Sequence, residues 1–409
     1  MITVAGLAGM VLAPPVAATA AAETSNDLVI ASLAPETGGY APILASLREP
    51  VRIAVDEINA AGGVGRGRQA RLVTADEGID ARSAVTATEQ LLDADHADAI
   101  IGPAASTSAL SILDTIKDSA LVCSGSNTAA QLTKDGPERS GGLYFRTSPP
   151  DKLQGSALAE LVLSDGRSNI ALLNPSDSYA TPLASSVARA LKDGGARVTH
   201  ASFDPGDEAL LDAARRVLRK KRDAVVVVAA APDGARIVKT LIDQGSGPAV
   251  LPMYGNDGLY DPGFVALVDA ANPGAVAGLT GTVPAADPGG PDTQFDKVFA
   301  ATGADAFFSA YYYDCTILTA LAAVKAKSDD PRKMAHAFAP NLKGGTDCVS
   351  FAACKQLLEQ GKSIHYRGAS SDFEEFGTSE PNQGAYDVWT YSPAAVAVLE
   401  GPDSQITIP

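Results

Sequence analysis

The stretch LVIASLAP (residues 28–35) is followed along the chain by PVRIAVDEINAAGG (residues 50–63). The first stretch is a short apolar run typical of a buried strand, and the second has apolar residues at helical spacing. We expect Pro50 as a first helical residue, and the pair Gly62–Gly63 as the point where this helix ends. A strand followed by a helix is the repeating unit of a parallel sheet.

This alternation of short strands and amphipathic helices continues along the chain. Further strand-like runs are RLVTADEG (71–78), ADAIIGP (97–103), ALVCSG (120–125), NIALLNP (169–175), ARVTHASFD (196–204), DAVVVVAA (223–230) and AVLPMYG (249–255). Strands that alternate with helices in this way indicate parallel sheets built from right-handed βαβ units. Because the rhythm restarts after LYFRTSPP (143–150), we predict an α/β protein with two doubly wound parallel-sheet lobes.

The chain after about residue 284 is mainly helical in pattern. Too few strands remain there for a third sheet, and GAYDVWTYS (384–392) is interpreted as a strand pair. We expect these segments to complete the two earlier lobes. The chain would then cross between the lobes more than once.

Composition and charge argue against a nucleic-acid partner. The chain has 409 residues, a length that suits two lobes, and 46% of them are hydrophobic. The net charge is -16 at pH 7, and no stripe of Lys and Arg could neutralise phosphates. The densest basic run, RRVLRKKR (215–222), is expected near a helix C-terminus, where cations are favourable.

The first residues are interpreted as an export signal. Residues 1–22 are uncharged and combine an apolar run with small residues before Glu23, although the usual positively charged start is missing. No later segment reaches 18 consecutive apolar residues, so no membrane span is expected. We therefore expect a signal peptide over 1–22 and a soluble protein in the periplasm or outside the cell, without the cysteine of a lipid anchor.

Export changes the interpretation of the four cysteines, because oxidising compartments favour disulfides. Cys348 and Cys354 bracket the short segment CVSFAAC, and a disulfide is favoured there. The alternative is a zinc site, but His365 is the only nearby histidine and no second pair has ligand spacing. The residues alone leave the pairing of Cys123 and Cys315 open.

Catalytic motifs are missing from this sequence. G-x-S-x-G does not occur, and GGVGRG (62–67) follows a helix, whereas a dinucleotide loop must follow a strand. Cys123 has no evident histidine partner. The histidines, which lie among polar residues away from strand ends, are His96, His200, His336 and His365. We predict that the protein is not an enzyme and that it uses neither a metal nor a cofactor.

Small polar residues follow two strands of the first predicted sheet. Ser106 lies after AIIGPAA, and Ser126 and Thr128 lie after ALVC. Ligands of open α/β sheets bind outside the carboxyl ends of the strands, where N–H and hydroxyl groups suit a carboxylate. Helix capping is the alternative for either stretch alone, but two in succession favour binding. Tyr179 and Asp257 follow strands of the second set.

The chain resembles an ABC-transporter solute-binding protein of the leucine/isoleucine/valine-binding family, which has the type I periplasmic binding fold. The stretches that carry the resemblance are AVDEINAAGGV (54–64), AIIGPAASTS (99–108), CSGSNTAAQLT (123–133) and LYFRTSPPDKLQG (143–155). The resemblance covers residues 27–400. It implies a first lobe of residues 27–148 and 284–366, and a second lobe of residues 149–283 and 367–400. It also implies a hinge of several strands that joins the lobes and a ligand cleft between them.

The resemblance also implies an amino-acid clamp. Ser106, Ser126 and Thr128 would hold the α-carboxylate of the solute. Tyr179 would contribute from the second lobe, Asp257 would pair with the α-ammonium, and Phe308 would lie beside the side chain of the solute.

Two departures from the family pattern concern the preferred side chain of the solute. Ala230 stands where the family has a tyrosine, and Tyr40 or Ile43 stands near the place of the aromatic residue in the first loop. The family layout puts Cys123 and Cys315 in the same lobe and so implies that they pair.

The function implied by the resemblance is capture of a small amino acid or amide-like solute. A monomer would deliver this solute to ABC permease subunits in the membrane. The alternative is an extracellular sensing module that presents its closed form to a receptor kinase. Neither alternative includes chemical turnover of the solute.

Overall fold

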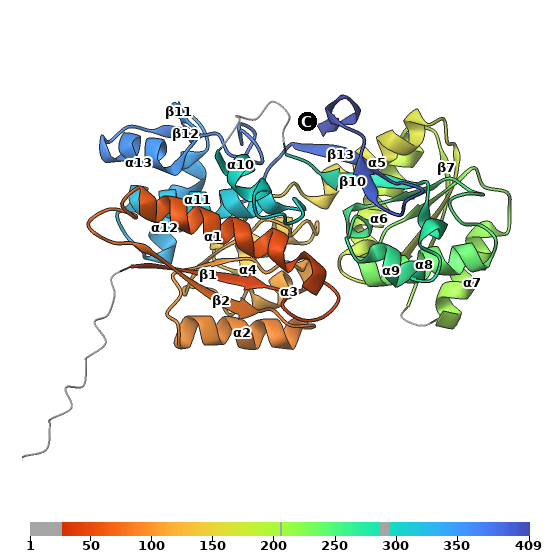
Figure 1. Ribbon diagram of the computed structural model, residues 1–409, viewed down its shortest axis with the longest axis horizontal. Coiled ribbons are helices and arrows are strands. Elements are labelled where there is room, and N and C mark those ends of the chain that lie inside the picture. Colours follow the sequence, from red (N-terminus) through yellow and green to blue (C-terminus); the bar gives the residue numbers. More distant parts are fainter. Residues whose placement is uncertain (1–26, 205–206, 287–293) are drawn as a thin grey trace, which may run out of the picture.

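The computed structural model describes residues 27–204, 207–286 and 294–409, and these form two lobes with separate sheets (Figure 1). The predicted α/β class, with a sheet of parallel strands in each half, is confirmed, and antiparallel strands that were not predicted extend the second sheet. The proposed signal peptide lies outside the described residues. Within the described residues, no helix has both the length and the apolar character that crossing a membrane requires.

The sheet of the first lobe is entirely parallel, with strand order β2-β1-β3-β4-β5. Its strands are β1 (Leu28–Ala34), β2 (Ala70–Asp76), β3 (Ala99–Ile101), β4 (Leu121–Ser124) and β5 (Tyr144–Arg146). Every residue of β1 is buried, and its side chains alternate between two apolar cores, one on each face of the sheet.

Helices from distant parts of the sequence cover the two faces of this sheet (Figure 1). One face carries α1 (Leu44–Ala60), α10 (Gln294–Ala300), α11 (Ser309–Ala326), α12 (Pro331–Phe338) and α13 (Phe351–Glu359). The other face carries α2 (Ala81–Asp93), α3 (Ser106–Ile112) and α4 (Leu132–Arg139). The mainly helical segment after residue 284 therefore completes the first lobe, as expected.

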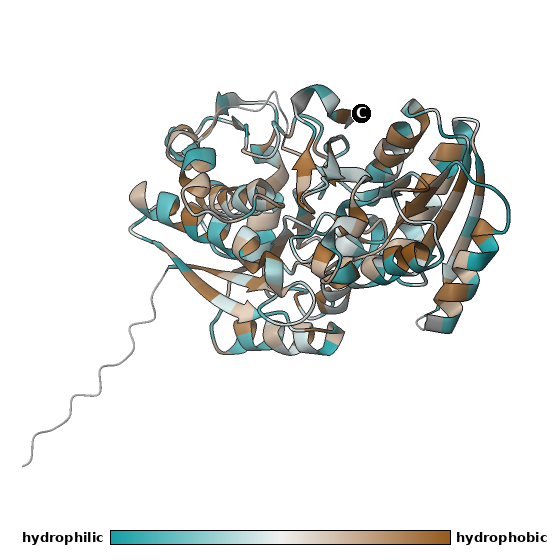
Figure 2. Ribbon diagram, turned by 45° about the vertical axis from the view of Figure 1, so that its right-hand side comes forward, coloured by the Kyte–Doolittle hydropathy of each residue, from teal (hydrophilic) through white to brown (hydrophobic). Residues whose placement is uncertain are grey.

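The sheet of the second lobe combines parallel and antiparallel strands, and several of its strands are brown, and so hydrophobic, on the right of Figure 2. The parallel strands are β6 (Asn169–Pro175), β7 (Arg197–Phe203), β8 (Ala224–Val227), β9 (Met253–Gly255) and β10 (Leu279–Pro284). The antiparallel strands are β13 (Gly384–Tyr391), β14 (Ala397–Leu399) and β15 (Ile406–Ile408).

Helices also cover both faces of the second sheet. On one face lie α5 (Asp151–Ser164) and α6 (Ala180–Asp193), and on the other lie α7 (Asp207–Leu218), α8 (Ala231–Asp243) and α9 (Phe264–Asp269). Short 3-10 helices are η1 (Ala41–Ile43), η2 (Asp257–Leu259), η3 (Pro273–Val276), η4 (Ala339–Asn341) and η5 (Pro402–Ser404).

The chain passes from one lobe to the other between β5 and α5, between β10 and α10, and again before β13 (Figure 1). This agrees with the expected hinge of several strands. The residue boundaries given above for each lobe stay a prediction.

The start of the first helix differs from the expectation. Helix α1 begins at Leu44, so Pro50 lies inside it rather than at its start. Leu47 is fully buried and precedes Pro50, so the apolar stripe that anchors α1 extends beyond the proline. Its burial compensates for the hydrogen bond that proline cannot make. The expected end of α1 is confirmed, because Gly62 and Gly63 have φ of 83° and 69°.

Two expectations about the C-terminal part are wrong. A third sheet exists, because β11 (Thr346–Cys348) and β12 (Ile364–Tyr366) pair in parallel. These strands have three residues each, too few for a recognisable sequence pattern. GAYDVWTYS contains one continuous strand, β13, rather than a strand pair. Its eight residues hold no turn signal and pair with β10 on one side and β14 and β15 on the other.

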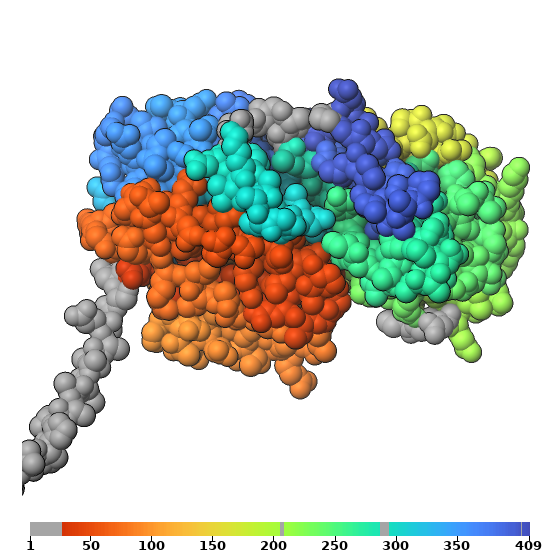
Figure 3. All heavy atoms as spheres, in the orientation of Figure 1, coloured from red at the N-terminus to blue at the C-terminus, as the bar shows by residue number. Residues whose placement is uncertain are grey.

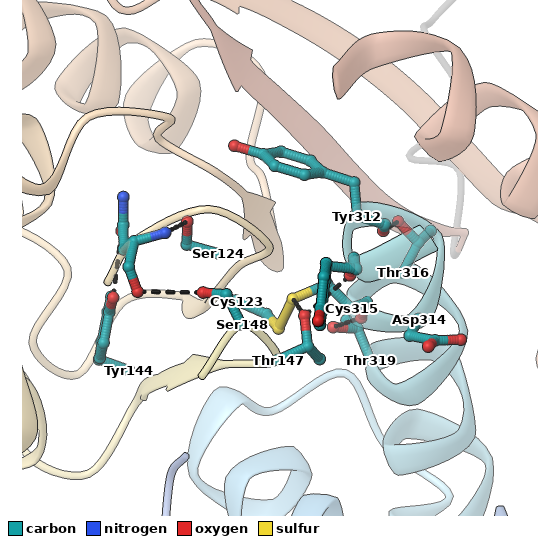
Figure 4. Close-up of a disulfide and its surroundings, with 12 residues drawn as sticks. Cys123, Ser124, Tyr144, Thr147, Ser148, Tyr312, Asp314, Cys315, Thr316 and Thr319 are labelled. Atoms are coloured by element: carbon teal, nitrogen blue, oxygen red, sulfur yellow. Dashed lines mark hydrogen bonds between the residues drawn. A yellow bond between two sulfur atoms is a disulfide. The ribbon is translucent and has the colours of Figure 1, made fainter. Parts of the chain in front are cut away.

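Both predicted disulfides are present. Cys123 of β4 pairs with Cys315 of α11 across 192 residues of sequence, and Figure 4 shows the bond running from the strand to the helix. Cys348 at the end of β11 pairs with Cys354 of α13, six residues later. The four cysteines are at most 5% exposed. The first bridge therefore joins segments that precede and follow most of the second lobe, and the second closes a local turn.

We expect the long disulfide to contribute more stability than the short one. In the chain-entropy model the 192-residue loop is worth about 5 kcal/mol and the six-residue loop about 2 kcal/mol. The double variant Cys123→Ala/Cys315→Ala should therefore lose more free energy of unfolding in urea than Cys348→Ala/Cys354→Ala. The two variants are matched, because all four side chains are buried. Equal losses would contradict the expectation.

Candidate functional site

A cavity of about 170 Å³ lies between the two lobes. Its walls include all six residues predicted from the sequence to contact a solute: Ser106, Ser126, Thr128, Tyr179, Asp257 and Phe308. They follow β3, β4, β6 and β9 or precede α11, so the cavity opens at the carboxyl ends of strands from both sheets. In Figure 3 the red and orange surface of the first lobe meets the green surface of the second.

Ser106 and Thr128 form part of the first-lobe wall. Ser106 begins α3, and its Oγ accepts a hydrogen bond of 3.3 Å from the Ala129 N–H, which connects the two loops. No acceptor for the Ser106 hydroxyl proton occurs among the described residues, so this proton is available to a solute. Thr107 is exposed next to it on the same wall.

Ser126 lies on the same wall but is already engaged. Its Oγ donates to the Ala104 carbonyl oxygen at 3.0 Å and lies 3.0 Å from Tyr312 Oη. Its N–H donates to Ser124 Oγ at 3.3 Å. A solute carboxylate would have to replace Ala104 as the acceptor. Ser126 does not cap a helix, because α4 begins only at Leu132.

A buried glutamate that the sequence analysis missed organises this wall. Glu77 accepts hydrogen bonds from the N–H groups of Ala104 at 2.6 Å and Ala105 at 3.1 Å, and from Ser108 Oγ at 3.4 Å. The N–H groups before α3 therefore already have the Glu77 carboxyl group as their acceptor. Glu77 is 1% exposed, and burial raises its pKa to about 7. Its position just after β2, at the edge of the sheet where ligands bind, could have identified it from the sequence.

Arg146 holds the loop that carries Thr128. Its guanidinium is fully buried and donates to the carbonyl oxygens of Asn127 at 3.1 Å and Ala129 at 3.0 Å. It also forms an ion pair with Glu380 at 2.5 Å. The residues on either side of Thr128 are thus fixed by one charged group, which the sequence analysis did not identify.

The second-lobe wall centres on Asp257 in η2. Tyr179 Oη donates to Asp257 Oδ1 at 2.7 Å, and Asn256 Nδ2 donates to Tyr179 Oη at 2.7 Å and to Asp257 Oδ1 at 3.1 Å. Asn256 is in turn held by the Ala229 N–H, which donates to its Oδ1 at 2.9 Å. Asn256 is therefore a positioning residue that the sequence analysis missed, although it stands beside Asp257 in the chain.

Asp257 is a buried carboxylate with several donors. Only 5% of it is exposed, and burial raises its pKa, while the bonds from Tyr179 and Asn256 favour the charged form. Asp177 is the other acidic residue of the wall, but its Oδ1 accepts from the N–H groups of Tyr179 and Ala180 at the start of α6. No Lys, Arg or His occurs among the described residues that line the cavity.

Two aromatic residues close one end of the cavity. Phe308 is at the predicted place and has φ of 56°, a left-handed conformation that is rare for phenylalanine. Phe307 packs against the apolar cores of both lobes, with its ring centroid 4.6 Å from Phe308 and 5.8 Å from Tyr260. Phe307 was not predicted, because only its contact with the second lobe reveals its place.

The remaining wall residues agree with the two departures noted in the sequence. Tyr40 and Ile43 both line the cavity, and Ala230 lies opposite them on the second lobe. The small side chain of Ala230 leaves room at this side of the cavity. Among the described residues, no group of three or more His, Cys, Asp or Glu side chains could hold a metal ion.

Comparison with known proteins agrees with this arrangement. A family model described as "Periplasmic binding protein" matches residues 27–351. The chain belongs to the periplasmic binding protein family. This periplasmic binding protein is 28% identical over 249 residues to the Leu/Ile/Val-binding protein BraC3 of Rhizobium johnstonii. The match covers 60% of this chain and 65% of BraC3, slightly less than two thirds of that relative.

Solved structures show the same two-lobe fold. The leucine-binding protein LivK of Thermotoga maritima superposes with a TM-score of 0.72 at 20% identity, covering 92% of this periplasmic binding protein and 99% of LivK. LivJ of Streptococcus pneumoniae, in complex with isoleucine, superposes with a TM-score of 0.70 at 19% identity, covering 93% and 99%. The type I fold expected from the sequence is therefore confirmed.

Glu77 should make stability depend on pH. Since its pKa is about 7 in the folded protein against an ordinary 4.5, the folded state holds a proton that the unfolded chain has lost between these values. The free energy of unfolding should therefore fall as pH rises through this window, by up to about 1.4 kcal/mol per pH unit.

The variant Glu77→Gln cannot titrate and should show a smaller decrease. Urea unfolding at several pH values between about 5 and 7.5 measures the difference. The other carboxyl groups titrate in both proteins, so they cancel in the comparison. Parallel pH dependences would show that Glu77 is ionised throughout this range.

Proposed function

We propose that this periplasmic binding protein captures a small amino acid between its lobes and delivers it to an ABC permease in the membrane. An amide-like solute fits the same class of site less well, because it offers no cation to Asp257. The observation that carries the proposal is the division of the cavity into two chemically different walls. One wall supplies neutral hydroxyl groups, and the other supplies a buried carboxylate.

A zwitterion matches these two walls. An amino acid enclosed between the lobes loses water from both charged ends, so each end needs a fixed partner. Ser106 and Thr128 on the first lobe would face the carboxylate, which Asp257 would repel. Asp257 on the second lobe would then face the ammonium group. The names of BraC3 and of the isoleucine complex of LivJ support the same class of solute.

Binding at both walls at once would favour closure of the lobes. A solute that contacts only one wall has no reason to prefer the closed state, whereas a solute that bridges the walls does. We further propose that the solute leaves unaltered, because no nucleophile with an adjacent base occurs among the described residues of the cavity. The protein would act as an exported monomer outside the cytoplasm.

A thermal-shift screen over amino acids, amides and small carboxylates tests the proposed function. At least one amino acid should raise the melting temperature, and by more as its concentration increases, since it binds only the folded state. Mass spectrometry of the recovered compound should find it unchanged. Chemical conversion of the compound, or stabilisation by none of the amino acids, would refute the proposal.

Asp257→Asn should weaken binding of this amino acid. Asparagine keeps the shape and can still accept from Tyr179, so the substitution removes the charge alone. Loss of a buried counter-charge should cost roughly 2–5 kcal/mol, about thirtyfold or more in Kd by calorimetry. Thermal unfolding without solute serves as the control and should be nearly unchanged. An unaltered Kd would mean that Asp257 does not face an ammonium group.

A further inference from the structure

A second carboxylate lies buried behind the cavity. Asp151 is the first residue of α5, directly after the chain leaves the first lobe, and it is fully buried. Its N–H donates to the Thr128 carbonyl oxygen at 2.8 Å, which ties it to the first-lobe wall. Neither carboxylate oxygen has a donor within normal hydrogen-bond geometry among the described residues. The Thr128 hydroxyl is the one side-chain donor near enough to favour its charged form.

Other polar groups around Asp151 also lack partners. Gln154 Oε1, Thr282 Oγ1 and Tyr386 Oη are buried without a hydrogen-bond partner in the described structure. Gln154 contacts two of its neighbours, because its Nε2 donates to the Thr282 carbonyl oxygen at 3.2 Å and its side chain also stabilises ionised Asp257. Asp151, three residues before Gln154 on α5, therefore lies near a group of buried polar side chains that includes Asp257 of the solute cavity.

Asp151 and Asp257 are close enough to repel each other, and the repulsion acts together with burial. Two buried carboxylates that share a site do not both ionise readily. Asp257 accepts hydrogen bonds from Tyr179 and Asn256, whereas Asp151 has no such donors. The charge therefore rests on Asp257 and the proton on Asp151. Burial first, and then Asp257, raise the pKa of Asp151 to about 8.

The other charged groups near Asp151 do not offset the effects that raise its pKa. Arg146 is the nearby cation, but it is already paired with Glu380, which Lys152 also approaches at 3.5 Å. The hydroxyl groups of Tyr179 and Tyr386 stay neutral, because burial keeps the pKa of each well above its ordinary value.

We propose that the pair of Asp151 and Asp257 carries one proton in the protein without solute, and that the ammonium group of a bound amino acid expels this proton. The proposal rests on the proposed function, since it requires a solute with an ammonium group. The proton leaves the Asp151 carboxyl for the solvent. The second carboxylate thus becomes ionised only when a cation is present to balance it.

Proton release makes the affinity depend on pH. The bound state holds fewer protons than the free state, so binding tightens as pH rises, by up to tenfold per unit, until the pair loses its proton at about pH 8 without solute. Glu77, behind the first-lobe wall, titrates near pH 7 and adds its own dependence. The wild-type protein and Asp151→Asn both retain Glu77, so the difference between their pH dependences reports the contribution of Asp151.

Calorimetry in buffers of different ionisation enthalpy measures the released proton. The probe is the L-amino acid that gives the largest shift in the thermal screen, titrated near pH 7 into the full chain in phosphate, HEPES and Tris. The wild-type protein should release close to one proton more than Asp151→Asn, which keeps the shape of the side chain but cannot ionise. The Kd of this variant should also change less between about pH 6 and 8.

Asp387→Asn is the matched control. Asp387 lies on β13 beside Tyr386, burial raises its pKa, and its Oδ1 accepts from Gln405 Nε2 at 2.8 Å, a bond that asparagine can keep. Neither Asp151 nor Asp387 lines the cavity, but Asp257 raises the pKa of Asp151 and not that of Asp387, so this variant should release as many protons as the wild-type protein. If Asp387→Asn released fewer protons than the wild-type protein, the released proton would come from Asp387 on β13, and the proposal would be overturned.

Two further results would overturn the proposal while leaving the proposed function intact. The first is tight binding of the amino acid by the wild-type protein without any release of protons, a measurement that needs no variant to fold. The second is equal release by the wild-type protein and Asp151→Asn. Failure of every amino acid to bind would instead refute the proposed function.

Discussion

The buried guanidinium of Arg146 connects the loop around Thr128, which forms part of the cavity wall, to the C-terminal part of the chain. It pairs with Glu380 from the C-terminal part of the chain and donates to two carbonyl oxygens of the loop around Thr128. A buried cation that lost any of these partners would be strongly destabilising, so the loop has little freedom. Thr128 is therefore held in place from behind, and Asp151 is attached to it by a backbone hydrogen bond.

The two walls of the cavity differ in how they are built. The first-lobe wall is organised around Glu77, whose carboxyl group occupies backbone N–H groups and leaves hydroxyl groups toward the cavity. The second-lobe wall is organised around Asn256, an amide that orients both Tyr179 and Asp257. Each wall has one buried polar residue whose task is to orient its neighbours. Solute recognition therefore depends on residues that do not need to touch the solute.

The sequence predicted the fold and the edge of the sheets where the cavity lies, because both follow from local patterns. Strand-helix alternation reports the sheets, and residues after strands meet at one edge. Glu77, Arg146 and Phe307 escaped notice because their roles arise from contacts with residues far away in the chain. The start of α1 was wrong for a related reason, since burial in the tertiary structure overrode the local preference of Pro50. What the sequence cannot show is which polar residues are left without partners once the lobes have folded.

The disulfide between Cys123 and Cys315 has a consequence for the order of assembly. The chain is synthesised from its N-terminus, so most of the second lobe is made after Cys123 and before Cys315. In the sequence, Cys123 and Cys315 both precede Cys348 and Cys354. A chain that enters an oxidising compartment N-terminus first would therefore offer Cys123 and Cys315 to each other before the later pair arrives, and the first lobe would be completed after strands β6 to β10 of the second lobe are present.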